Sequence, residues 1–116
     1  MARLFQASWL FLICAGLTLA SACRQSDPPI RVNGTALVVE NQTREPWRDV
    51  VVTVNGYYRG TAGTLAPGAR LDANLGNFVT GFGQRFDPKR ERVRVVEVKA
   101  TDPSGKPVTL ELRNDR

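Results

Sequence analysis

A run of β-branched residues leading into an Asn-Gly pair restricts the fold of this chain more than any other feature. Residues 50–54 read Val-Val-Val-Thr-Val, Asn55-Gly56 comes next, and Tyr57-Tyr58 follows it. Valine and threonine favour strands, and Asn-Gly accepts the two positive φ angles of a type I′ turn. The sequence therefore predicts an antiparallel hairpin, with the even-numbered valines of its first strand on one buried face.

Short runs of alternating apolar residues, separated by turn signals, continue to the end of the chain. The runs are residues 35–40, 71–75, 92–100 and 108–112, and the turn signals are Leu65-Ala66-Pro67-Gly68 and Asp102-Pro103-Ser104-Gly105. Because no stretch after residue 34 has the spacing of an amphipathic helix, we predict six or seven short strands. This pattern predicts an all-β fold, a single small antiparallel β-sandwich of the immunoglobulin-like or fibronectin III-like type, over residues 35–113.

The run at residues 92–100 changes its alternation phase in the middle. Val93 and Val95 are odd-numbered, whereas Val96, Val98 and Ala100 are even-numbered. One extra residue in a strand reverses the side to which the following residues point. We therefore expect a β-bulge near Val95 and Val96 that brings both sets to the core face.

The aromatic residues allow two interpretations, core packing or contact with a ligand. Trp47 opens the predicted hairpin strand and is expected to fill the core between two sheets. Phe78, Phe82 and Phe86 recur at every fourth position, but the glycines between them disfavour a helix. We expect a loop whose phenylalanines cover one end of the core. In the other interpretation, a ligand or partner contacts four aromatic residues: Trp47, Tyr57, Tyr58 and Phe82.

Residues 1–22 have the features of an export signal. Arg3 is their only charge, residues 4–19 are mostly apolar, and Ala20-Ser21-Ala22 is a small-residue cleavage signal. A transmembrane helix needs about 20 apolar residues, and this run is shorter. We therefore expect an N-terminal signal helix that is removed on export.

Cys23 follows this signal directly, and its surroundings resemble a bacterial lipobox. Residues 19–23 read Leu-Ala-Ser-Ala-Cys, with the leucine displaced by one position from the usual pattern. The resemblance implies a lipidated Cys23 and attachment to a membrane. Because residue 24 is Arg and not Asp, analogy with enteric lipoproteins favours the periplasmic side of the outer membrane. The alternative is ordinary cleavage after Ala22, which leaves a soluble periplasmic chain with a free thiol.

Residues 23–34 are expected to form a tether between this anchor and the folded domain. The segment is polar and contains Pro28 and Pro29, which lack the N–H donors of a sheet ladder. Proline-containing segments act as stiff spacers. The domain is therefore expected to begin at residue 35.

The composition excludes several kinds of chemistry. The chain has no histidine, and after Cys23 its only serines are Ser26 and Ser104, so a Ser-His or Cys-His device is excluded. Zinc and haem lack their usual ligands. Acid pairs such as Asp72 and Asp87 are expected in solvent, and fewer than 95 residues after the leader leave little material for a substrate cleft. We expect no catalytic residues, no metal, no cofactor and no enzymatic activity.

A basic run is the strongest chemical feature of the domain. It contains Arg85, Lys89, Arg90, Arg92 and Arg94, interrupted by Asp87 and Glu91. One interpretation is contact with an anionic surface, such as lipid headgroups, lipopolysaccharide phosphates or an acidic partner. The other is a solvated strand edge whose charges prevent edge-to-edge pairing. A formal net charge of +5 is too small to indicate nucleic acid.

Several short motifs resemble an uncharacterised family of short exported bacterial proteins, lipoproteins among them. The motifs are Leu37-Val38-Val39-Glu40-Asn41, Trp47-Arg48-Asp49-Val50, Val54-Asn55-Gly56-Tyr57-Tyr58, Leu65-Ala66-Pro67-Gly68, and Phe78 followed by Gly83-Gln84-Arg85-Phe86-Asp87-Pro88. The resemblance covers residues 35 to 112. It implies an immunoglobulin-like or fibronectin III-like sandwich and brings no activity with it.

Together these features predict a membrane-tethered, extracytoplasmic lipoprotein. We expect a non-enzymatic interaction or structural module of the cell envelope, attached through Cys23, with another envelope protein as partner. The alternative is a soluble periplasmic carrier that holds a small apolar or anionic ligand among the four aromatic residues named above.

Overall fold

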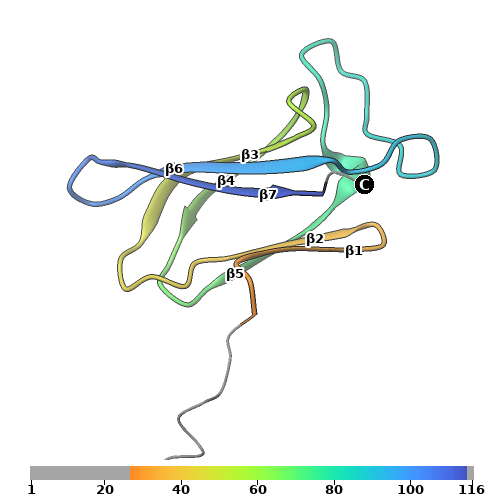
Figure 1. Ribbon diagram of the computed structural model, residues 1–116. Helices are drawn as coiled ribbons and strands as arrows, with labels where there is room; N and C mark the ends of the chain where they lie inside the picture. Colours follow the sequence, from red (N-terminus) through yellow and green to blue (C-terminus); the bar gives the residue numbers. More distant parts are fainter. Residues whose placement is uncertain (1–26, 115–116) are drawn as a thin grey trace, which may run out of the picture.

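The computed structural model describes residues 27–114, which form two antiparallel sheets facing each other (Figure 1). The strands are β1 (Ile30–Asn33), β2 (Ala36–Glu40), β3 (Trp47–Val54), β4 (Tyr58–Leu65), β5 (Arg70–Asn74), β6 (Val95–Thr101) and β7 (Pro107–Arg113). One sheet has the order β1-β2-β5 and the other β4-β3-β6-β7. The predicted all-β fold of two antiparallel sheets is confirmed. The expected signal helix and Cys23 lie outside the described residues.

The only helical element within residues 27–114 is a 3₁₀ turn at Leu75–Asn77. Asn74 precedes this turn, and its side chain accepts a hydrogen bond from the Gly76 amide. In this part of the chain no helix is long and apolar enough to cross a membrane.

The core is built from alternate residues of the central strands. Leu37 and Val39 of β2 are 0 % exposed, and the even-numbered valines of β3 and β6 are 0–1 % exposed. All belong to one hydrophobic cluster between the sheets. Trp47, at the start of β3, is 2 % exposed and belongs to the same cluster, so its core interpretation is confirmed.

The predicted hairpin joins β3 to β4. Asn55 and Gly56 have φ angles of 53° and 78°, and the amide of Tyr57 donates to the carbonyl of Val54 at 3.2 Å. This is the geometry that the Asn-Gly pair predicts. Tyr57 stays outside the ladder, and Tyr58 begins β4 opposite Val54.

The predicted tether is too long, because its second half belongs to the sheet. Ile30 pairs with Val39, Asn33 pairs with Ala36, and Ile30 is 3 % exposed. Pro28 and Pro29 do not interrupt the strand, since they precede its first ladder residue. The short turn at residues 34–35 then returns the chain to β2, so the domain includes residues that the sequence assigned to the spacer.

The bulge expected near Val95 and Val96 is not present. The β6–β7 register runs unbroken from Val95 to Thr101, and the strand begins only at Val95, so the apparent phase change marks the end of a loop. The irregularity lies instead in β3, where the register shifts between Trp47 and Val50. Asp49 has a φ of 53° there, an uncommon value for a residue other than glycine.

A buried polar residue links the connections that cross between the two sheets. The side chain of Asn41 is 0 % exposed, and its Nδ2 donates to the carbonyls of Glu45 at 2.8 Å and Leu65 at 3.0 Å. Its Oδ1 accepts from the amide of Thr43 at 3.0 Å and from Oγ1 of Thr43 at 2.6 Å. The backbone of Asn41 bonds the loop at residues 66–69. In the sequence Asn41 only follows the predicted strand at residues 35–40, and no local pattern indicates this role.

Antiparallel strands place all connections at two opposite ends of the sandwich. The turn at residues 55–57 and the long loop between β5 and β6 lie at one end, on the right in Figure 1. The first described residues, 27–29, lie at the other end, with the connections that follow β2, β4 and β6. We call this second end the junction end, and define it as residues 27–29, 40–47, 65–70 and 101–107.

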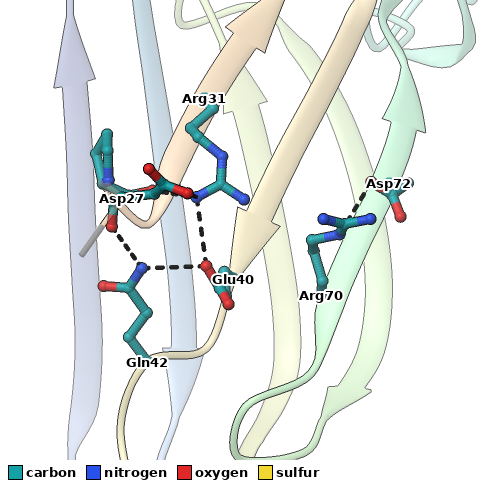
Figure 2. Close-up of polar contacts among 7 residues, drawn as sticks. Asp27, Arg31, Glu40, Gln42, Arg70 and Asp72 are labelled. Atoms are coloured by element: carbon teal, nitrogen blue, oxygen red, sulfur yellow. Dashed lines mark hydrogen bonds and ion pairs between the residues drawn. The ribbon is translucent and has the colours of Figure 1, made fainter. Parts of the chain in front are cut away.

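Polar contacts hold the start of the described chain against the junction end. Figure 2 shows Arg31 and Gln42 converging on the carboxylate of Glu40, at 3.3 Å and 3.1 Å. Gln42 also donates to the carbonyl of Asp27 at 2.6 Å, and the Glu40 amide donates to the carbonyl of Pro29 at 2.8 Å. The hydrogen bond from Gln42 is the main cause that lowers the pKa of the Glu40 carboxyl below its ordinary value. The chain is thus fixed to the domain from Asp27 onward.

Candidate functional site

The exposed hydrophobic side chains gather at the end opposite the junction. Within residues 27–114, three large hydrophobic residues are exposed: Tyr57 at 72 %, Val79 at 37 % and Phe82 at 96 %. Tyr57 lies in the hairpin turn, and the other two lie in the loop before β6. We call residues 55–59 and 79–94 together the aromatic–basic end.

Phe82 stands at the tip of a structured turn. The amide of Thr80 donates to the carbonyl of Gln84 at 2.9 Å, and the amide of Gly83 donates to the carbonyl of Thr80 at 3.0 Å. The Thr80 hydroxyl accepts hydrogen bonds from the backbone amides of Phe82 at 3.3 Å and Gln84 at 3.1 Å. Gly83 has a φ of 84°, which favours glycine. These bonds present the phenyl ring on a fixed backbone.

This turn is joined to the edge of the larger sheet. Val79 forms a two-way backbone bridge with Arg59 of β4, at 2.8 Å and 3.3 Å, and a second bridge with Arg85. Phe78 and Phe86, on either side, are 3 % and 2 % exposed and cover the end of the core as predicted. The prediction was wrong for Phe82, which points into solvent because the turn carries it beyond the sheets.

The two exposed aromatic rings border one open hollow of about 480 Å³. One wall comes from the hairpin and the other from the loop before β6. The lining residues are Gly56, Tyr57, Tyr58, Arg59, Thr80, Gly81, Phe82 and Gln84. The fold therefore brings together Tyr57, Tyr58 and Phe82, three of the four aromatic residues that the sequence proposed for contact.

Trp47 does not belong to this group. It begins β3, whereas Tyr57 follows the end of that strand, so about 26 Å of extended chain separates them. It is also closed off in the core. The predicted four-residue aromatic site is therefore not formed.

Asn55 holds the loop before β6 against the hairpin. Its Oδ1 accepts the amides of Arg94 at 2.7 Å and Val95 at 3.2 Å, and its Nδ2 donates to the carbonyl of Arg92 at 2.8 Å. Nδ2 also contacts the Glu91 carboxylate at 3.3 Å. Sequence analysis predicted only a turn role for Asn55, because these partners lie 36 to 40 residues away.

Tyr58 and Glu91 complete this support. The Tyr58 hydroxyl donates to Oε1 of Glu91 at 2.7 Å, and its ring meets the ring of Phe86 edge-on at 5.1 Å. The hydrogen bond to Glu91 is the main cause that raises the pKa of the Tyr58 hydroxyl above its ordinary value. Tyr58 is thus half-buried and structural, whereas Tyr57 beside it is free to make contacts.

The basic run lies at the same end. All five basic residues are exposed in the loop before β6. Arg85 is bridged to Val79 beside the sheet edge, whereas Lys89, Arg90, Arg92 and Arg94 lie outside any strand, so the strand-edge interpretation is wrong for these four. Arg90 forms an ion pair with Asp87 at 3.8 Å, and both side chains are half exposed or more. Arg59 adds a sixth basic group that the sequence missed. The only sequence feature that pointed to Arg59 as part of this site was its position beside the predicted hairpin turn.

The charge differs between the two ends. The aromatic–basic end carries six basic and two acidic residues, whereas the junction end carries three basic and four acidic residues. Such an asymmetry attracts negatively charged partners to one end only.

A second open hollow lies where the loop before β6 passes the turn between β1 and β2. Its volume is about 630 Å³, and Leu75, Phe86 and Val93 are among its apolar lining residues. Arg92 and Arg94 lie at its border. No sequence pattern indicates this hollow, because it forms between segments far apart in the chain.

Groups for chemistry are few in the part of the chain that the structure describes. There, no three His, Cys, Asp or Glu side chains lie close enough together to hold a metal ion, and no buried side-chain polar atom lacks a hydrogen-bond partner. Comparison of the chain with family models, with curated proteins and with solved structures found no match. The resemblance to an exported bacterial family stays a prediction.

Proposed function

We propose that this chain is a membrane-tethered, extracytoplasmic interaction module of the bacterial envelope, attached through a lipidated Cys23 and without enzymatic activity. The observation that carries the proposal is the gathering of Tyr57, Val79 and Phe82 at one end, on a backbone fixed by hydrogen bonds. Large aromatic side chains are the usual energetic centres of protein interfaces. A rigid support reduces the entropy lost when they bind.

The free energy available from burying the exposed Phe82 ring in a partner supports this function. A buried aromatic side chain removes about 150 Å² or more from water, which at about 25 cal/mol per Å² contributes about 4 kcal/mol. Phe82 keeps nearly all of this area exposed in the isolated chain. A partner with a pocket for this ring would gain most of it.

We also propose that the sandwich is immunoglobulin-like or fibronectin III-like. The sheet orders β1-β2-β5 and β4-β3-β6-β7 support this, since neighbours in each sheet are antiparallel and the chain crosses repeatedly between layers. A buried tryptophan on the third strand is a common feature of the immunoglobulin type, and Trp47 has that place.

The anchor is tested by changing each of the two cysteines. The wild-type protein is expected to enter the detergent phase on cloud-point separation and to incorporate labelled palmitate. Cys23→Ala should abolish both, whereas Cys14→Ala, in the predicted leader, should leave both unchanged. Wild-type protein in the aqueous phase without label would refute the lipid anchor.

The second candidate is a soluble periplasmic carrier of a small apolar or anionic ligand. The hollow of about 630 Å³ bordered by Arg92 and Arg94 favours it, because apolar lining and positive charge suit a small amphipathic anion. Two observations weigh against the carrier: Trp47 is buried in the core and does not line the hollow, and the hollow is open to solvent. Aqueous wild-type protein that copurifies with such a molecule would favour this candidate over the tethered module.

A further inference from the structure

We propose that the aromatic–basic end docks on an acidic protein surface held away from the membrane that carries the tether. The proposal rests on the lipid anchor at Cys23 put forward above. It adds the direction in which the module faces and the chemistry of its partner.

The direction follows from the short distance between Cys23 and the folded chain. Asp27 is already bonded to Gln42 at the junction end, so four peptide steps separate it from Cys23. Four extended residues span at most about 14 Å. An anchored chain therefore keeps its junction end beside the membrane.

The opposite end then faces away from that membrane. The eight residues of β3 place the hairpin turn about 26 Å from the junction end, and the long loop between β5 and β6 projects past the larger sheet at that far end (Figure 1). The charge agrees with this orientation, because the junction end is close to charge balance even when the adjacent Arg31 and Arg48 are counted, so it attracts anionic headgroups less than the opposite end does.

The shape and charge of the far end indicate the partner. Phe82 protrudes and requires a pocket, whereas the hollow between Tyr57 and Phe82 accepts a protruding side chain. A folded protein offers both a pocket and a protrusion, and a lipid surface offers neither in fixed form. The excess of arginine around the rings requires carboxylates at the rim of the partner's pocket.

The test uses the full chain in cells, with a photo-crosslinking phenylalanine analogue at position 82 or, as a control, at position 104. Ser104 is exposed at the junction end. We expect a discrete protein adduct from position 82, about tenfold stronger than any adduct of the same mass from position 104. Mass spectrometry should place the crosslink in a partner segment flanked by Asp or Glu.

Charge reversal distinguishes a specific dock from chance proximity. Arg94→Glu is expected to reduce the adduct about tenfold, since like charges across an interface repel. Arg44→Glu makes the same chemical change at an exposed position of the junction end and should leave the adduct unchanged. Equal effects of the two variants would overturn the proposal.

A lipid target is tested with the Phe82→Trp full-length protein and vesicles of phosphatidylglycerol and phosphatidylcholine. If the proposal is right, adding vesicles shifts the tryptophan fluorescence of Phe82→Trp to the blue no more than that of Phe82→Ser. Phe82→Ser is the control because it has no fluorescent side chain at position 82. A larger shift would overturn it in favour of a membrane. Detergent partition of the protein from the crosslinking cells separates the anchor hypothesis from the docking hypothesis. Protein in the aqueous phase refutes the lipid anchor. Protein in the detergent phase without an adduct from position 82 refutes only the docking proposal.

Discussion

Replacing Asn41 with alanine is expected to destabilise the sandwich by about 3 kcal/mol. The carbonyl of Leu65 would lose its buried donor, and an unsatisfied buried group costs about 1–3 kcal/mol. The bonds to Glu45 and Thr43 are partly accessible to water, so each contributes about 0.5 kcal/mol or more. The total is a large part of the roughly 4–13 kcal/mol expected for a domain of this length.

Two further variants show which part of the Asn41 side chain matters. Asn41→Asp keeps the oxygen that accepts from Thr43, but removes the N–H donors and turns a charge toward two carbonyl oxygens. We expect it to be at least as destabilising as alanine. Asn77→Ala removes an exposed amide and is expected to change stability by less than about 0.5 kcal/mol.

The assay is urea denaturation of a chain starting at Arg24, followed by the fluorescence of Trp47, the only tryptophan after the leader. A loss of about 3 kcal/mol corresponds to a melting temperature lower by about 12–24 °C for a domain of this size. If Asn41→Ala unfolds within about 1 kcal/mol of wild type, or if Asn41→Asp is neutral, the hydrogen-bonding argument for this residue is wrong.

Three further predictions concern packing and pH. Gly60→Ala is expected to cost about 1–3 kcal/mol, because a Cβ there would lie 2.8 Å from the Phe78 ring, whereas Gly81→Ala, with nothing within 4 Å, should be nearly neutral in the same denaturation assay. Trp47→Ala is expected to cost about 3–5 kcal/mol and the exposed Phe82→Ala less than about 0.5 kcal/mol, with both followed by circular dichroism because the first variant lacks the fluorescent tryptophan; equal losses would contradict their assignment to core and surface. Hydrogen bonds led by that from Ser104 lower the pKa of Asp102 below its ordinary value of 3.8. Its stabilisation is therefore complete above that value and lost as the pH falls through the folded pKa, so Asp102→Asn should flatten the acid side of a plot of melting temperature against pH.

The candidate site was predicted in its residue types but not in its arrangement. The sequence selected the basic run and the aromatic residues because exposed charge and large rings are the groups that bind. The core interpretation was correct for Trp47 and wrong for Phe82, since one repeat of phenylalanines every fourth position does not say which ring meets the sheets. Arg59 and Val79 join the site through a backbone bridge between residues 20 positions apart, which no local pattern encodes.

Local sequence was sufficient to predict the elements whose cause is local. Alternating valines with Asn55-Gly56 specify the β3–β4 hairpin, and the turn at Leu65-Ala66-Pro67-Gly68 follows from proline and a glycine at a φ of 76°. These features depend on backbone sterics and on contacts between residues that are close in the sequence, so the sequence is enough to predict them.

The tertiary structure alone decided which side chains are buried and which segments meet. Ile30 became a strand residue because β2 offered it a ladder partner, and Asn41 became a core residue because the two sheet connections needed a shared donor. The exposed rings and the arginines came to one end because antiparallel strands return every second connection to the same place. Burial depends on partners that are distant in the chain, and such partners are specified only when the whole chain packs.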